Sequence, residues 1–170
     1  MKNKRSFEDL FFDGLRDMLD GERQIAKALP KMSKKASNPE LKKALEKHVS
    51  ETQEHIERLE KIFALCDVQV RANRCEATQG ILREAEEVLA YADSSATCDA
   101  AIIAATQKVE HYEMSTYGTL RTFGEVLDFN DAAKLLQVTL DEESNMDSTL
   151  NSLASTINVN ALEELHEMSA

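Results

Sequence analysis

Four glutamates occupy positions where the helical periodicity of the chain otherwise places apolar side chains. At about 100° per residue, each of them falls within or at the edge of the apolar stripe of a different expected helix. They are Glu22, Glu51, Glu110 and Glu143. A buried carboxylate is strongly disfavoured unless it pairs with a cation or coordinates a metal ion. Four such residues on four helices therefore predict a common partner, of which a pair of divalent metal ions is the simplest.

Nearby side chains could complete such a site. His48 and His55 lie three and four residues from Glu51 on the same helical face, so either could supply a nitrogen ligand. Glu113 follows Glu110 by three residues and could add a further carboxylate. Because an oxygen-rich ligand set suits iron and manganese, the prediction is a dinuclear iron or manganese site.

Other polar residues are weaker candidates. His111 points about 100° away from Glu110 and is not expected to be a ligand, whereas Asp147 is an outer candidate. Tyr112 and Tyr117 could line a metal pocket or simply pack in the core. Known di-metal bundles use Glu-x-x-His pairs on two helices, and the four expected helices contain none, so the match is partial.

Each candidate also has a structural alternative when it is taken singly. An inward glutamate is more often a solvated side chain or one partner of an ion pair, and a histidine is more often an outer or surface residue. Arg and Lys are scarce on the apolar stripes. The metal site is therefore favoured by the whole set of glutamates, not by any one of them.

The apolar periodicity predicts four long helices that would position these residues. The first runs from Ser6, which can cap it, to Leu29, because Pro30 disfavours continuation. The second starts after Asn38 as its N-cap and reaches about Cys66. The first two helices are expected to form a hairpin.

The second half of the chain repeats this arrangement. A third helix is expected to end near Phe123, and the loop Gly124–Phe129 then turns the chain. Asn130 or Asp131 can cap the fourth helix, which continues to roughly Ala154. Two similar hairpins predict an all-α four-helix bundle, with residues 1–170 forming a single domain.

Shorter segments join these helices. A peripheral helix is expected at Glu76–Ala92, inside the crossover between the two hairpins, and the tail after Ile157 is expected to fold as a short helix or to fray. The remaining connections are the linker Lys31–Asn38, the irregular stretch Asp67–Arg74, and the break at Asp93, Ser94 and Ser95.

Composition limits the classes of partner. The chain has 170 residues and a formal net charge of -11 at pH 7, so nucleic acid and anionic membrane surfaces are not expected partners. No segment approaches transmembrane length, and acidic residues interrupt the N-terminal region where a signal peptide would need an apolar core. Three widely spaced cysteines argue against a disulfide framework, so a soluble, cytoplasmic protein is expected.

Several runs of residues resemble the YciF-like family, a branch of the ferritin-like superfamily. The resemblance extends from about Phe7 to Ala154, and the most specific run is Ala104–Glu113 with Tyr117-Gly118-Thr119. The other runs are Met18–Gln24, Ala28–Met32, His48–Thr52, Ile56–Leu59, Cys75–Ala77 and Leu140–Glu143.

The resemblance implies a ferritin-like bundle that forms a homodimer, carries a di-metal site and is linked to bacterial stress responses. It places the metal at Glu22, Glu51, Glu110, Glu113 and Glu143. The sequence departs from the family pattern at Glu54 and His55, which leaves the nitrogen ligand open between His48 and His55.

Two functions are predicted from these observations. The first is a di-iron or di-manganese protein that handles peroxide, oxygen or metal ions. The alternative is a non-enzymatic, dimeric, stress-associated protein with a structural or partner-binding role and a vestigial metal site. A storage cage is less favoured, because no assembly features for it can be identified, and catalytic turnover is left open.

Overall fold

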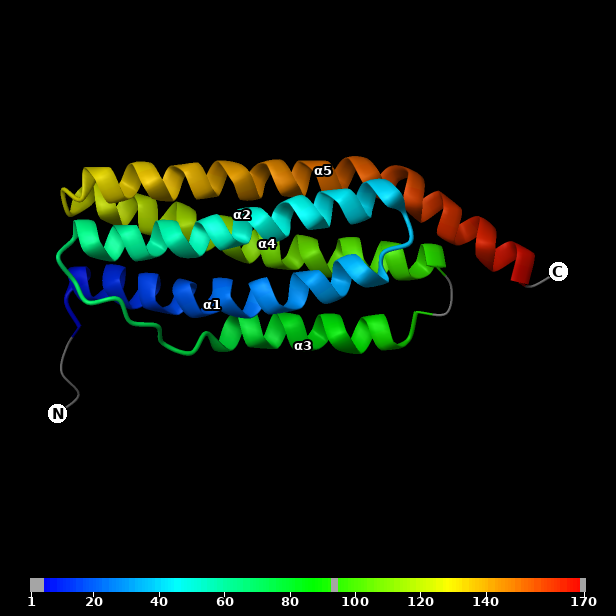
Figure 1. The fold of residues 1–170 in the computed structure, drawn as a ribbon, viewed down its shortest axis with the longest axis horizontal. Helices are drawn as coiled ribbons and strands as arrows, with labels where there is room; N and C mark the ends of the chain where they lie inside the picture. Colours follow the sequence, from blue (N-terminus) through cyan, green and yellow to red (C-terminus); the bar gives the residue numbers. More distant parts are fainter. Residues whose placement is uncertain (1–4, 93–94, 169–170) are drawn as a thin grey trace.

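The computed structural model describes residues 5–92 and 95–168, which form five α-helices and no strand (Figure 1). The helices are α1 (Phe7–Lys35), α2 (Pro39–Leu65), α3 (Glu76–Ala90), α4 (Ser95–Val126) and α5 (Asn130–Met168). The predicted all-α fold is confirmed. Among these five helices, none combines the length and the apolar character that crossing a membrane requires.

The four long helices form a bundle in which α1 and α2 make one hairpin and α4 and α5 make the other (Figure 1). The hairpins contact each other through α2 with α5 and through α1 with α4. Helix α3 lies outside this square against α1 and α4, and the chain after α2 runs back along α1 to reach it (Figure 1). The bundle thus brings four helix faces to one central axis.

Local capping explains where two of these helices begin. Ser6 and Asp9 form a reciprocal capping box at the start of α1, in which the Ser6 side chain accepts from the Asp9 amide and Asp9 accepts from the Ser6 amide. The Asn38 side chain accepts from the amides of Glu40 and Leu41, and Pro39 occupies the first turn of α2. Both predicted caps are confirmed.

Helix α1 passes through Pro30, so the predicted end at Leu29 is wrong. The helix continues to Lys35, which also shortens the predicted linker. Proline inside a helix removes one hydrogen bond and costs roughly 3 kcal/mol. Met32 and Ser33 in the added turn are both buried against the bundle, and this burial offsets the local cost.

The second hairpin is also longer than predicted. Helix α4 includes Gly124 and ends at Val126, so the loop is shorter than expected. Helix α5 continues well past Ala154, because Ile157 is buried and the Glu164 carboxylate accepts hydrogen bonds from Ser95 and Ala96 at the start of α4. Tertiary contacts therefore extend a helix whose local pattern is weak.

Ser95 belongs to α4, so it is not part of the predicted break before that helix. Asp93 and Ser94, the other two residues of that break, lie outside the described residues. The expected short helix is α3, which ends at Ala90, two residues earlier than predicted.

Apolar side chains fill the bundle in two separate clusters. One contains Ile25, Leu45, Ile102 and Leu150, and the other contains Phe11, Leu59, Tyr117 and Leu136. The layer between them is polar and buried: it contains Glu22, His48, Thr52, His55, Thr106, Glu110, Glu113, Thr139 and Glu143. The fold therefore sets a charged layer at the middle of an otherwise apolar bundle.

Candidate metal centre

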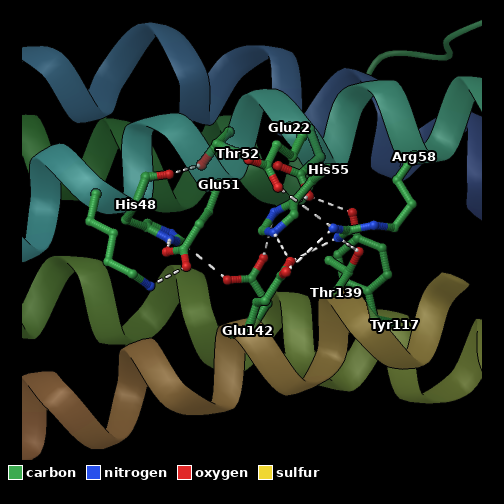
Figure 2. Close-up of polar contacts among 12 residues, drawn as sticks. Glu22, His48, Glu51, Thr52, His55, Arg58, Tyr117, Thr139 and Glu142 are labelled. Carbon is green, nitrogen blue, oxygen red and sulfur yellow. Dashed lines mark hydrogen bonds and ion pairs between the residues drawn. The ribbon is translucent and has the colours of Figure 1, made fainter.

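The central layer collects most of the residues predicted to bind metal. Six of them are at most 1% exposed: Glu22, His48, His55, Glu110, Glu113 and Glu143. They come from all four long helices, because each sits on the inward stripe of its helix. Figure 2 shows His55 projecting from α2 toward Glu22 of α1 and Glu142 of α5, and His48 beside Glu51 of α2.

These residues form two groups that could each hold a metal ion. His48, Glu110, Glu113 and Glu143 offer one ligand atom each within 4.8 Å of one another. Glu22, His55 and Glu143 make a second group under the same limit. Glu143 is the member that the two groups share, so a single carboxylate joins them.

The histidines face these carboxylates with one ring nitrogen each. His48 Nε2 lies 3.1 Å from Glu110 Oε1 and 3.8 Å from Glu143 Oε2. His55 Nδ1 lies 3.0 Å from Glu143 Oε1 and 3.3 Å from Glu22 Oε1. The distances place nitrogen and oxygen donors around common points in the core.

Many of these donor atoms lack a hydrogen bond among the described residues. Both carboxylate oxygens of Glu110, Glu113 and Glu143 have none, and neither has His55 Nδ1 or His48 Nε2. Buried polar atoms in folded proteins are nearly always satisfied, and exceptions call for an ion or another functional explanation. The donor set, with buried oxygens and nitrogens that make ion-pair contacts but no hydrogen bond, therefore fits divalent metal ions.

The pKa values of the cluster show how burial and charge compete. Burial raises the pKa of Glu110 to about 8, although the nearby His48 ring opposes the shift. Burial lowers the pKa of His55, but the adjacent Glu143 and Glu22 outweigh it and bring the value to about 10. Burial also raises the pKa of Glu113 well above its usual range, and Glu143 adds to this. Without metal, the core holds protons in place of cations.

Glu51 is the predicted ligand that the structure leaves outside both groups. Its side chain is 17% exposed and forms an ion pair with Lys47, one turn earlier on α2. Glu51 Oε2 lies 3.8 Å from His48 Nδ1, the nitrogen on the outer side of that ring. The competing Lys47 ammonium explains this outward position.

The weaker candidates also lie outside the two groups. Asp147 accepts a hydrogen bond from Gln107 and lies 3.3 Å from the exposed His111, which was not expected to be a ligand. The longer α5 contains one Glu-x-x-His run, Glu163 to His166, but both residues are exposed and far from the cluster along the helix. Tyr117 is fully buried and donates a hydrogen bond to Glu22.

Sequence reasoning missed a set of polar residues around His55. Glu142 Oε2 lies 2.9 Å from His55 Nε2, and Arg58 contacts the same carboxylate (Figure 2). The position of Arg58, three residues after His55 on one helical face, was the available indication. Glu142 comes from a different helix, and no local spacing could reveal it.

Sequence comparisons relate this chain to a known family. Residues 6–163 match the family described as Domain of unknown function (DUF892). Protein YciF of Escherichia coli (strain K12) is 40% identical over 153 residues, which cover 89% of this chain and 92% of that protein.

Several solved structures have the same fold as this chain. The E. coli stress protein YciF superposes with a TM-score of 0.88 at 39% identity, covering 92% of this chain and 99% of that one. YcfI of Rhodopseudomonas palustris, described provisionally as a structural protein, superposes with a TM-score of 0.86 at 39% identity. The match covers 88% of this chain and 96% of that one. A Xanthomonas campestris protein shares the fold, with a TM-score of 0.77 at 21% identity. The match covers 95% of this chain and 99% of that one.

Proposed function

The chain belongs to the DUF892 family and is a relative of YciF, and on that premise we propose that it is a single-domain protein that binds a pair of iron or manganese ions and acts in a stress response. The stress context comes from the E. coli relative, which is described as a stress protein. The metal pair comes from the core of this chain.

One observation carries the proposal: two buried ligand groups share Glu143. Inward-facing carboxylates and histidines from four helices hold metal pairs in di-metal helical bundles, and Glu143 is placed so that it could serve both ions. Glu110 and Glu113 would supply oxygens to one ion together with a nitrogen of His48, while Glu22 and His55 would serve the other.

Metal ions bound here would supply redox chemistry with oxygen or peroxide. The protein residues would bind and orient the ions and keep water away, since the six side chains of the two groups are at most 1% exposed. Tyr117 would hold one Glu22 oxygen through its hydrogen bond, so the other oxygen stays free to bind metal. The proposal therefore includes oxidant handling, with turnover left to experiment.

An anaerobic titration tests metal binding directly. Purified, metal-free protein is expected to bind about two Fe²⁺ or Mn²⁺ per chain, and the melting temperature should rise with added metal, because an ion that binds only the native state stabilises it. Exposure of the iron-loaded protein to oxygen and to peroxide should change its absorbance. A stoichiometry near zero with an unchanged melting temperature would contradict the proposal.

Metal affinity is expected to increase with pH. A ligand must lose its proton before it binds metal, and the pKa values of Glu110 (about 8) and His55 (about 10) keep both groups protonated at neutral pH in the metal-free core. Calorimetry at about pH 6 and about pH 8, in buffers of different ionisation enthalpy, should show tighter binding at the higher pH and protons released on binding. Affinity independent of pH would indicate that these groups are not ligands.

A second candidate function is a dimeric structural or partner-binding protein whose carboxylates are vestigial. It is favoured by the structural role given provisionally to the R. palustris relative. Under this second function, the chain would not gain thermal stability from iron or manganese, whereas the first proposal requires such a gain. Under either function we infer a cytoplasmic homodimer. Gel filtration would test the dimer and would exclude a storage cage.

A further inference from the structure

The two core histidines differ in what holds the ring nitrogen that faces away from the candidate metal sites. His55 Nε2 lies 2.9 Å from Glu142 Oε2. Since a carboxylate only accepts hydrogen bonds, Nε2 carries a proton, and it keeps this proton when the ring gives up the one on Nδ1 to bind a metal ion. His55 Nδ1 then faces Glu143 and Glu22 as the nitrogen available for a metal ion.

Glu142 is itself fixed by an arginine. Arg58 Nη1 donates to Glu142 Oε2 at 2.8 Å and Nη2 donates to Oε1 at 3.3 Å, which is a two-point contact. The same guanidinium donates to Thr139 Oγ1 at 2.6 Å. The Arg58 side chain is 13% exposed and that of Glu142 is 25% exposed, so the contact is partly shielded from solvent.

His48 has no comparable support among the described residues. Its outward nitrogen, Nδ1, makes no hydrogen bond and lies 3.8 Å from Glu51 Oε2. Glu51 is in turn paired with Lys47, whose side chain is 72% exposed. Figure 2 shows both arrangements, with Arg58 and Glu142 around His55 and Glu51 beside His48.

We propose that Arg58 and Glu142 are positioning residues that fix His55 as an Nδ1 ligand and thereby set the affinity of the ion held by Glu22, His55 and Glu143. This inference rests on the proposed metal site. Carboxylates that orient a metal-binding histidine typically change metal affinity by about 10- to 100-fold when they are removed. Removing Arg58 or Glu142 should lower the affinity for only one of the two ions, because these residues contact His55 and not His48.

The test uses Zn²⁺ as a diamagnetic probe on the full-length protein. Glu142→Ala and Arg58→Met are expected to weaken one of the two binding steps by about 10- to 100-fold in calorimetry and to leave the other nearly unchanged. Glu142→Gln should lose less than Glu142→Ala, since an amide oxygen can still accept from Nε2. Partial recovery of metal affinity in Glu142→Gln, relative to Glu142→Ala, is a result that a merely structural role of Glu142 would not produce.

Histidine ring NMR gives a second readout. In the zinc-loaded parent protein, the ¹⁵N and ¹³C shifts of His55 should report Nδ1 bound to metal, whereas Glu142→Ala should give a mixture of Nδ1 and Nε2 ligation. Glu60→Ala is the matched control, because it breaks another glutamate–arginine pair, between Glu60 of α2 and Arg23 of α1, whose side chains are both 43% exposed. It should leave both binding steps and the His55 shifts unchanged.

The outcomes separate this inference from the proposed function. If the parent protein binds no Zn²⁺, Fe²⁺ or Mn²⁺, the proposed function fails and the inference falls with it. If the parent protein binds about two ions while Glu142→Ala and Arg58→Met weaken both steps equally, weaken neither, or leave the His55 shifts unchanged, only the positioning role is overturned.

Discussion

Glu143→Ala is expected to weaken binding of both metal ions so far that neither survives gel filtration, whereas Glu22→Ala should affect only one. Glu143 is the residue shared by the two ligand groups, and its side chain is fully buried. Its removal leaves one group with His48 and two carboxylates and the other with Glu22 and His55. Elemental analysis after gel filtration should give no retained metal in Glu143→Ala and about one ion per chain in Glu22→Ala.

The matching control is Glu57→Ala, which removes an exposed glutamate from α2. It should retain about two ions per chain. Glu143→Gln keeps the size of the side chain and should bind no metal while folding normally by circular dichroism, so lost binding is not confused with unfolding. Two retained ions in folded Glu143→Gln would show that the shared carboxylate is not a ligand.

Helical periodicity predicted much of the candidate site because burial leaves a regular pattern. A side chain at three, four or seven residues from apolar neighbours must face the core. Glu22, Glu110 and Glu143 obey this rule, and the structure buries all three completely. Polar residues are conspicuous at such positions, so their grouping could be anticipated without coordinates.

Periodicity does not determine which way a side chain at the edge of the stripe turns. Glu51 and His55 both border the inward face of α2, yet Glu51 turns to Lys47 while His55 is buried. A lysine one turn away is a local competitor, and its effect depends on rotamers that the sequence does not specify. The contact of Arg58 with Glu142 joins residues 84 positions apart and leaves no periodic trace.

Helix ends were harder to predict than helix faces for a related reason. Pro30 is a local stop, but the burial of Met32 carries α1 beyond it. The tail after Ile157 has little apolar pattern, and its helix depends on the hydrogen bond from Ala96 to Glu164. Both segments are fixed by contacts with distant parts of the chain, which local propensity does not include.

Glu113→Leu is expected to stabilise the metal-free protein and to impair metal binding. Neither Glu113 oxygen makes a hydrogen bond among the described residues, and the side chain is 1% exposed. Replacing buried ion pairs by apolar residues of similar volume is often neutral or stabilising by about 1–4 kcal/mol, and removing Glu113 leaves no hydrogen-bonded partner behind. For a chain of this size that range corresponds to a rise of several degrees in melting temperature, measured by calorimetry in the presence of a chelator.

The gain in stability from Glu113→Leu should increase with pH. Burial, followed by the charge of Glu143, raises the pKa of Glu113 well above its usual range in the folded chain. The unfolded chain therefore releases this proton at a lower pH than the folded chain does, so this group makes stability fall as pH rises above the unfolded value of about 4.3. Glu113→Leu removes that loss, and its advantage should be larger at about pH 8 than at about pH 5.

An exposed glutamate provides the control for this trade between stability and binding. Glu84, which pairs with Lys108 on the surface and is 55% exposed, should change the melting temperature little when replaced by leucine, because surface substitutions usually stay within about 0.5 kcal/mol. If Glu113→Leu instead lowered the melting temperature of the metal-free protein, Glu113 would be a structural residue of the core. A rise accompanied by loss of metal would mean that the core gives up stability in order to bind metal.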